Sequence, residues 1–86
     1  MSETHEHRLK RLKIRAWRRG TKEMDLILGS FVDAKIGTLN AAELDALEAL
    51  MAEQDLELYT WFTGQVPVPA EHSVILLKIS NEIKLF

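Results

Sequence analysis

Apolar residues recur at intervals of three and four along most of the chain, and this periodicity restricts the possible folds more than any other feature. Such spacing places apolar side chains on one face of an α-helix, whereas a half-buried strand requires strict alternation of apolar and polar residues. The sequence contains no alternating segment of useful length between hairpin turns. The pattern therefore predicts an all-α fold, a small single-domain bundle of about five helices.

Residues that typically begin or end helices divide the chain into five segments. Gly20 interrupts the first apolar pattern, and Asn40 followed by Glu43 has the spacing of a capping box. Asp55 is expected to be the N-cap of a short fourth helix, which Gly64 ends. The predicted helices cover about 6–18, 21–36, 40–51, 55–64 and 70–84.

A chain of 86 residues that is 47% hydrophobic is too small for two domains and too apolar for disorder. We expect a flexible N-terminal tail over residues 1–7 and one helical domain over 8–86. The absence of cysteine excludes a disulfide framework, a zinc ribbon and a catalytic thiol. No apolar run approaches the roughly 20 residues of a membrane span, and the polar start lacks the apolar core of a signal peptide. The bacterial cytoplasm is the expected compartment.

Residues that usually carry catalysis or bind metals form no recognisable site in this sequence. The histidines are His5, His7 and His72, and the first two lie two positions apart, which is not the spacing of a helical ligand pair. No glycine-rich phosphate loop is present, and no serine lies in the sequence context of a nucleophile. We therefore predict no catalytic residue, no metal site and no stably bound cofactor.

Charge is distributed unevenly along the chain. Residues 1–22 contain eight of the eleven basic residues and two acidic ones, a net charge of +6, whereas the remainder carries −8. A basic face of this kind can bind nucleic acid, an acidic protein surface or only solvent. The helix expected after Gly20 begins with acidic and apolar residues, unlike a recognition helix that enters a DNA groove. A protein-binding face is therefore favoured, and a nucleic-acid-binding or antitoxin-like regulatory module is the alternative.

The segment from Arg19 to Glu23 is the most distinctive in the chain. Gly20 permits a turn with positive φ or a close approach of another backbone. Glu23 falls in the first turn of the next predicted helix, near the positive end of the helix dipole. Arg19 can pair with Glu23 or present its guanidinium to a carboxylate of a partner. On physical grounds alone, a well-capped joint between two helices explains these residues.

This segment, followed by Met-Asp-Leu-Ile-Leu-Gly-Ser-Phe, resembles the SdhE family of succinate dehydrogenase assembly factors. The family signature is Arg-Gly-x-x-Glu, and its fixed positions correspond to Arg19, Gly20 and Glu23. A second family element, Asp-Leu-Tyr-x-Trp, is matched in part by Leu58, Tyr59 and Trp61. Asp55 matches only loosely, because two residues separate it from Leu58. The resemblance covers about residues 8–80.

The resemblance implies a five-helix protein that binds the flavoprotein subunit of succinate dehydrogenase and, as a further partner, that of fumarate reductase. Such proteins promote covalent attachment of FAD to a histidine of that subunit. The flavin chemistry then belongs to the partner, so this chain is expected to be an assembly factor rather than an enzyme. We expect neither a nucleic-acid partner nor membrane insertion.

Candidate partner-binding residues follow from the matched motif and from charge. The motif supplies Arg19, Gly20 and Glu23. Basic charge beside the motif adds Arg15, Arg18 and Lys22. Trp17 is either a contact residue or part of the core. Three aromatic residues of the fourth helix are expected in the core: Tyr59, Trp61 and Phe62.

Overall fold

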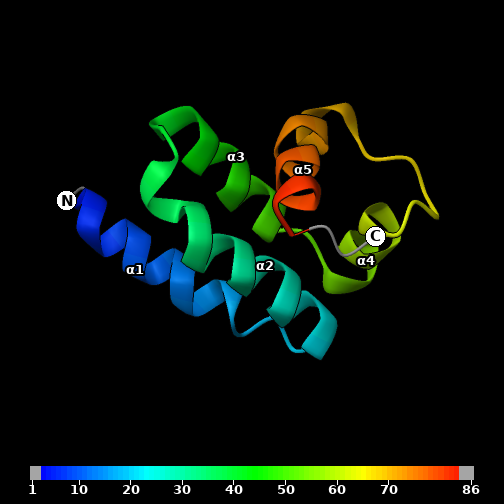
Figure 1. Ribbon diagram of the computed structural model, residues 1–86, viewed down its shortest axis with the longest axis horizontal. Coiled ribbons are helices and arrows are strands. Elements are labelled where there is room, and N and C mark those ends of the chain that lie inside the picture. The colour runs from blue at the N-terminus through cyan, green and yellow to red at the C-terminus, as the bar shows by residue number, and fades with distance from the viewer. Residues whose placement is uncertain (1–2, 84–86) are drawn as a thin grey trace.

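The computed structural model describes residues 3–83, which form five α-helices joined by turns and loops (Figure 1). The helices are α1 (His5–Ala16), α2 (Lys22–Lys35), α3 (Ala41–Met51), α4 (Asp55–Phe62) and α5 (Ala70–Ile83), with a 3₁₀ turn η1 (Ile36–Thr38) after α2. No strand occurs within residues 3–83, so the predicted all-α fold of about five helices is confirmed. The expected end of the last helix at Lys84 lies outside the described residues.

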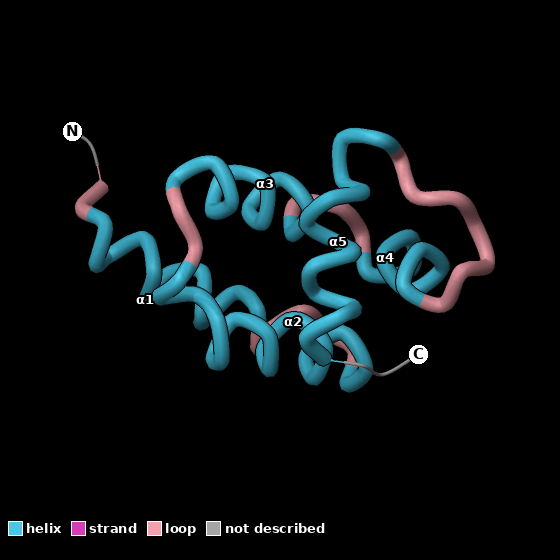
Figure 2. Tube along the Cα trace, turned by 45° about the horizontal axis from the view of Figure 1, so that its top comes forward, coloured by secondary structure: helices cyan, strands magenta, loops and turns pink. Residues whose placement is uncertain are grey.

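Helix α2 occupies the middle of the bundle. It runs antiparallel to α1 after the short turn 17–21, and it also packs against α5 and α4 (Figures 1 and 2). Helix α3 packs against α5, and the loop 63–69 leads from α4 to the start of α5. None of the helices in the described part of the chain is long and apolar enough to cross a lipid bilayer. The turn between α1 and α2 therefore lies at the end of the bundle that α4 also occupies.

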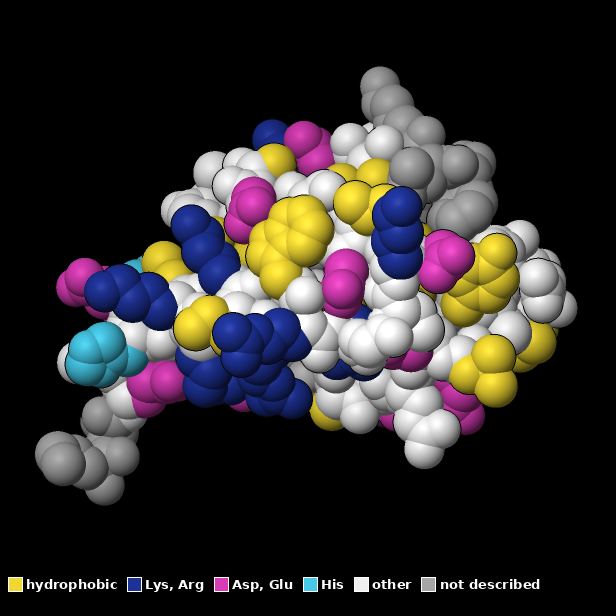
Figure 3. All heavy atoms as spheres, turned by 90° about the horizontal axis from the view of Figure 1, so that it is seen from below, with side chains coloured by type: hydrophobic (Ala, Val, Ile, Leu, Met, Phe, Trp, Pro, Cys, Tyr) yellow, Lys and Arg dark blue, Asp and Glu magenta, His cyan; other side chains and the backbone are white. Residues whose placement is uncertain are grey.

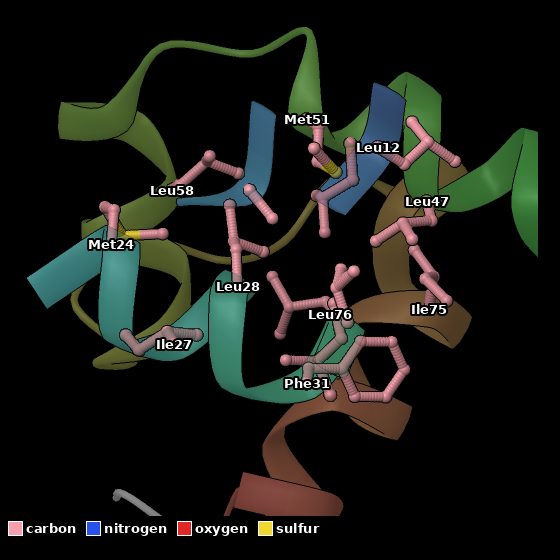
Figure 4. Packing of buried hydrophobic residues seen from close by; sticks show 14 of the residues in the cluster. Leu12, Met24, Ile27, Leu28, Phe31, Leu47, Met51, Leu58, Ile75 and Leu76 are labelled. Carbon is pink, nitrogen blue, oxygen red and sulfur yellow. The ribbon is translucent and has the colours of Figure 1, made fainter. Parts of the chain in front are cut away.

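The core is built from inward-facing apolar residues of all five helices. Figure 4 shows Leu28 and Phe31 of α2 pointing into a cluster with Leu12, Leu47 and Leu58, and each of these side chains is fully buried at 0% exposure. Burial of one such side chain contributes about 1.5–3 kcal/mol. Because the cluster joins α1, α2, α3 and α4, it fixes the position of the α1–α2 turn relative to α4.

Helix α5 buries only some of its apolar residues. Ile75 and Ile79 are buried, whereas the side chains of Val74 and Leu77 are 82% and 60% exposed. Apolar residues occupy four successive positions, 74–77, so the sequence fits more than one helical face. Packing against α2 and α3 selects the face that is buried. Its buried residues are His72, Ile75, Leu76 and Ile79.

Side-chain caps define the starts of α1 and α3. Thr4 Oγ1 accepts a hydrogen bond from the His7 backbone N–H at 3.1 Å, so α1 begins at His5 and residues 5–7 are helical. The predicted capping box is confirmed: Glu43 N–H donates to Asn40 Oδ1 at 2.8 Å, and Asn40 N–H donates to Glu43 Oε1 at 3.0 Å. This backbone hydrogen bond from Asn40 holds the pKa of the Glu43 carboxyl below its usual value.

The start of α4 differs from the prediction. Gln54, not Asp55, is the N-cap residue, and its side chain makes no capping hydrogen bond. Asp55 is the first residue of the helix, and its carboxylate binds Arg19. The prediction of an Asp55 cap is therefore wrong because a tertiary ion pair occupies that carboxylate.

Candidate functional site

The turn between α1 and α2 has the conformation that its glycine permits. Gly20 has a φ of +101°, in the left-handed region that side chains with a Cβ rarely adopt. A Cβ at this position would meet nothing nearer than Asp55 Oδ2 at 3.9 Å, so no close backbone approach among residues 3–83 requires the glycine. Thr21 caps α2 by accepting a hydrogen bond from the Met24 N–H at 3.3 Å. This cap places Glu23 in the first turn of α2, as predicted.

Arg19 is turned into the molecule, where it holds the connection between α3 and α4. Its Nε donates to Asp55 Oδ1 at 2.8 Å, its Nη2 donates to the Glu53 carbonyl at 2.7 Å, and its Nη1 donates to the Met51 carbonyl. The Arg19 side chain is 11% exposed and that of Asp55 is 15% exposed. The last carbonyls of a helix have no hydrogen-bond donor within the helix. Arg19 supplies a donor to the carbonyl of Met51, the last residue of α3, and another to the carbonyl of Glu53 just beyond it.

Of the two alternatives considered for Arg19, the pair with Glu23 is not formed. The Arg19 side chain binds Asp55, and its backbone N–H donates to Asp25 Oδ1 at 2.7 Å, which fixes the turn to α2. The side chain of Glu23 is exposed and forms no hydrogen bond or ion pair within residues 3–83. The two charged motif residues therefore point in different directions, one into the fold and one to its surface.

Glu23 borders a surface hollow, which we call the α2–α4 hollow. The hollow has a volume of about 310 Å³. Its lining residues are Thr21, Glu23, Asp55, Leu56 and Tyr59. Helices α2 and α4 pack against each other at this end of the bundle, so the two segments that resemble family elements meet here.

The aromatic residues of α4 divide between the core and this hollow. Trp61 and Phe62 are buried at 9% and 6% exposure, as predicted. Tyr59 was expected in the core, but its side chain is 37% exposed and lines the α2–α4 hollow. Leu56, which the sequence analysis did not select, is 77% exposed on the same side. Leu56 lies two positions before the buried Leu58 and therefore on the opposite face of the helix, which is the signal that indicates an exposed leucine.

Three of the predicted contact residues form a basic patch, defined as Arg15, Arg18 and Lys22. All three are exposed, and none forms an ion pair within the range 3–83. Figure 3 shows the face formed by α1 and α2, where lysine and arginine side chains gather over α1 beside exposed hydrophobic side chains. The basic patch lies on both sides of the turn that contains Gly20.

Arginine side chains in the first half of α1 form ion pairs with carboxylates of α3. Arg8 contacts Asp45 Oδ1 at 2.7 Å and Glu48 Oε1 at 3.1 Å, and Arg11 contacts Glu48 Oε2 at 3.0 Å. Glu48 of α3 is half-buried because the arginine side chains of α1 lie against its carboxylate. The hydrogen bond from Arg11 holds the pKa of the Glu48 carboxyl below its usual value.

Replacing Glu48 by glutamine is expected to lower the free energy of unfolding at pH 7 by about 1 kcal/mol, the size typical of a partly exposed ion pair. Because the folded-state pKa of Glu48 is depressed, this contribution is present above the unfolded pKa of about 4.3 and is lost as the pH falls through the folded value. Urea unfolding of both proteins from pH 7 to pH 3 measures it. A difference in unfolding free energy between wild type and variant that is the same at pH 7 and pH 3 would contradict the ion pair. Glu57→Gln, on the exposed surface of α4, is the control.

Trp17 is neither a core residue nor a free contact residue. Its ring lies on Gly29 of α2, and its Nε1 donates to Asp33 Oδ2 at 3.1 Å. The side chain remains 40% exposed. Trp17 therefore forms a fixed apolar surface next to the basic patch.

His72 is a buried polar residue that the sequence analysis did not assign. Its side chain is 5% exposed, its Nε2 lies 2.8 Å from Glu53 Oε2, and its ring stacks on Trp61 with 5.6 Å between centroids. Glu53 thus binds His72 through its carboxylate and Arg19 through its carbonyl. Among the described residues, Glu53, Glu71 and His72 have ligand atoms close enough together to share a metal ion. The helical spacing of His72 from Ile75 and Ile79 is the signal that indicates its burial.

Comparison with known protein families identifies this arrangement. A family model described as "Flavinator of succinate dehydrogenase" (Sdh5) matches residues 10–82 of the chain. The chain belongs to this family. The resemblance predicted from the Arg-Gly-x-x-Glu segment is thereby confirmed, and all six candidate contact residues lie within the matched part of the flavinator family model.

Relatives of this flavinator family member are found in bacteria and eukaryotes. The chain is 41% identical over 71 residues to the FAD assembly factor SdhE of Acetobacter pasteurianus, which covers 83% of this chain and 65% of that protein. It is 38% identical over 69 residues to the mitochondrial succinate dehydrogenase assembly factor 2 of Mycosarcoma maydis, covering 80% of this chain and 29% of the relative. The chain thus spans less than two thirds of the length of either relative.

Proposed function

We propose that this chain is an assembly factor that binds the flavoprotein subunit of succinate dehydrogenase and promotes covalent attachment of FAD to a histidine of that subunit. The observation that carries the proposal is the match of the flavinator family model to residues 10–82. The flavoprotein subunit of fumarate reductase is proposed as a second partner. In this proposal FAD is attached to the partner and is not bound stably by the chain itself.

The chain acts by binding rather than by catalysis. Covalent attachment requires a histidine and a flavin of the partner to be held in a reactive geometry, and correct positioning can remove several kcal/mol of an activation barrier. A binding protein shifts its partner toward one conformation only if it binds that conformation more tightly. The rigid helical bundle and its exposed turn are suited to this role, because the turn is fixed by Arg19 before any partner arrives.

The six candidate residues have different proposed roles. Glu23 and the basic patch of Arg15, Arg18 and Lys22 are exposed and contact the partner directly. Gly20 provides the positive φ that lets the turn present these residues. Arg19 is a positioning residue, because its side chain is engaged inside the fold.

The compartment proposed for this process is the bacterial cytoplasm. The likeness to the SdhE protein of Acetobacter pasteurianus supports it. The proposal includes neither insertion into a membrane nor a nucleic-acid partner.

The proposed function predicts loss of covalent flavin when the gene is deleted. In-gel flavin fluorescence of the denatured succinate dehydrogenase flavoprotein measures it. The wild-type gene is expected to restore the fluorescent band and Glu23→Ala is not, because Glu23 is exposed and has no internal partner to lose. Glu71→Ala is the matched control, since Glu71 is also an acidic residue in the first turn of a helix.

An unchanged fluorescent band in the deletion strain would contradict the assembly role. The basic patch should then be tested for nucleic-acid affinity that falls steeply with salt concentration.

A further inference from the structure

The α2–α4 hollow contains two carboxylates whose binding capacity the chain does not use fully. The Glu23 side chain makes no hydrogen bond or ion pair with any residue in the range 3–83. Asp55 binds Arg19 through Oδ1, and Oδ2 accepts no hydrogen bond from the described residues. Both residues line the same hollow of about 310 Å³.

The remaining walls of the hollow are apolar. Leu56 is 77% exposed and Tyr59 is 37% exposed, although both could be covered by a side chain entering between α2 and α4. The hollow thus offers both apolar surface and carboxylate oxygens. Such a lining provides contacts for a group with an apolar body and a positively charged end. An anion would be repelled by Glu23 and Asp55. A purely apolar group would leave the two carboxylates without partners once water is excluded.

Apart from Arg19, no cation within residues 3–83 forms an ion pair with Glu23 or Asp55. The three donor nitrogens of Arg19 are already engaged by Asp55 and by the carbonyls of Met51 and Glu53, and Lys22, which precedes Glu23, is exposed and pairs with neither carboxylate. The carboxylate oxygens at the hollow are therefore open to a cation of another molecule.

We propose that a cationic side chain of the flavoprotein subunit, an arginine or a lysine, docks in the α2–α4 hollow. Its charged end binds Glu23 and Asp55 Oδ2, and its aliphatic stem lies on Leu56 and the ring of Tyr59. A guanidinium suits this lining well, because it is planar, donates several hydrogen bonds and stacks on aromatic rings. The identity of the partner rests on the proposed function, whereas the charge of the docking group rests on the hollow.

This contact also gives the interaction a direction. The acidic hollow and the basic patch adjoin at the start of α2, where Lys22 of the patch stands between Thr21 and Glu23 of the hollow in the sequence. Opposite charges placed at two points along one surface favour a single orientation of a complementary partner. The partner surface is expected to present a cation to the hollow and carboxylates to the basic patch.

The test measures the affinity of the full chain for the purified flavoprotein subunit by calorimetry. Glu23→Gln keeps the size of the side chain and removes its charge, and it is expected to weaken binding at least tenfold. Glu71→Gln is the matched control and is expected to bind within twofold of wild type. Thermal unfolding followed by circular dichroism establishes that each variant is folded.

A charge exchange then identifies the docking group. Glu23→Lys is expected to abolish binding to the wild-type flavoprotein, and one replacement of an exposed flavoprotein arginine or lysine by glutamate is expected to restore it. If Glu23→Gln weakens binding but no such replacement restores it, a cation in the hollow is ruled out.

Two further results separate this proposal from the function on which it rests. If the wild-type chain binds the flavoprotein and both Glu23→Gln and Leu56→Ala bind within twofold, the hollow is not the docking point and the assembly role stands. If the wild-type chain does not bind the flavoprotein at all, both the docking proposal and the assembly role fail.

Discussion

Replacing Arg19 by methionine is expected to lower the free energy of unfolding by about 3–5 kcal/mol, because it leaves a largely buried carboxylate without its cation. Asp55 is 15% exposed and loses its only ion pair among the described residues. The carbonyls of Met51 and Glu53 lose their donors as well. Small domains are typically stable by about 5–15 kcal/mol, so a large part of the total would be lost. Urea unfolding followed by far-UV circular dichroism measures the change.

Two variants control for charge and for size. Arg18→Met removes the neighbouring arginine, which is exposed and forms no ion pair within residues 3–83, and should change stability by no more than about 0.5 kcal/mol. Arg19→Lys keeps the charge but cannot reach three acceptors, so an intermediate loss is expected. Equal stabilities of Arg19→Met and Arg18→Met would show that Arg19 is not a structural residue.

The outcome bears on how the Arg-Gly-x-x-Glu motif works. An arginine in a short motif is readily interpreted as a contact residue, yet Arg19 donates its side-chain hydrogen bonds to residues of the same fold. Glu23, four residues later, has no internal partner and is exposed. A failure of Arg19 variants in flavinylation therefore needs a stability measurement beside it, whereas a failure of Glu23 variants reports on the partner surface.

The local features of the fold were predictable from the sequence because their causes lie within a few residues. The capping box of Asn40 and Glu43 spans three positions and is present as predicted. The positive φ of Gly20 and the place of Glu23 in the first turn of α2 depend on the same short range. Helical periodicity likewise gave the number of helices.

The misassigned contacts depend on residues that are distant in the sequence. Arg19 and Asp55 are 36 positions apart, so local spacing favoured Glu23 as the partner and a cap as the role of Asp55. The same holds for His72 and Glu53, which are separated by 19 positions. Tyr59 lies on a short helix with one buried face, and only the position of α2 decides that this residue borders a hollow. These contacts require the packing of the helices to be known first.

Replacing Gly29 by alanine is expected to destabilise the chain by about 1–3 kcal/mol, although alanine normally favours a helix over glycine by about 1 kcal/mol. A Cβ at Gly29 would overlap the ring of Trp17, since it would lie 2.8 Å from Cε3 and closer still to Cδ2 and Cε2. The ring must move, and its hydrogen bond to Asp33 is then lost. Urea unfolding measures the loss, and a red shift of the tryptophan emission reports the movement.

A double-mutant cycle separates the clash from the helix propensity. In a Trp17→Ala background the ring is absent, so Gly29→Ala should become neutral or stabilising by up to about 1 kcal/mol. Stabilisation by Gly29→Ala in both backgrounds would mean that Trp17 does not rest on α2. The expected reversal of sign would show that the smallest side chain at position 29 is needed to seat the indole. Trp17 would then be a rigid surface between α1 and α2, held next to Arg18 in the position from which a partner can be contacted.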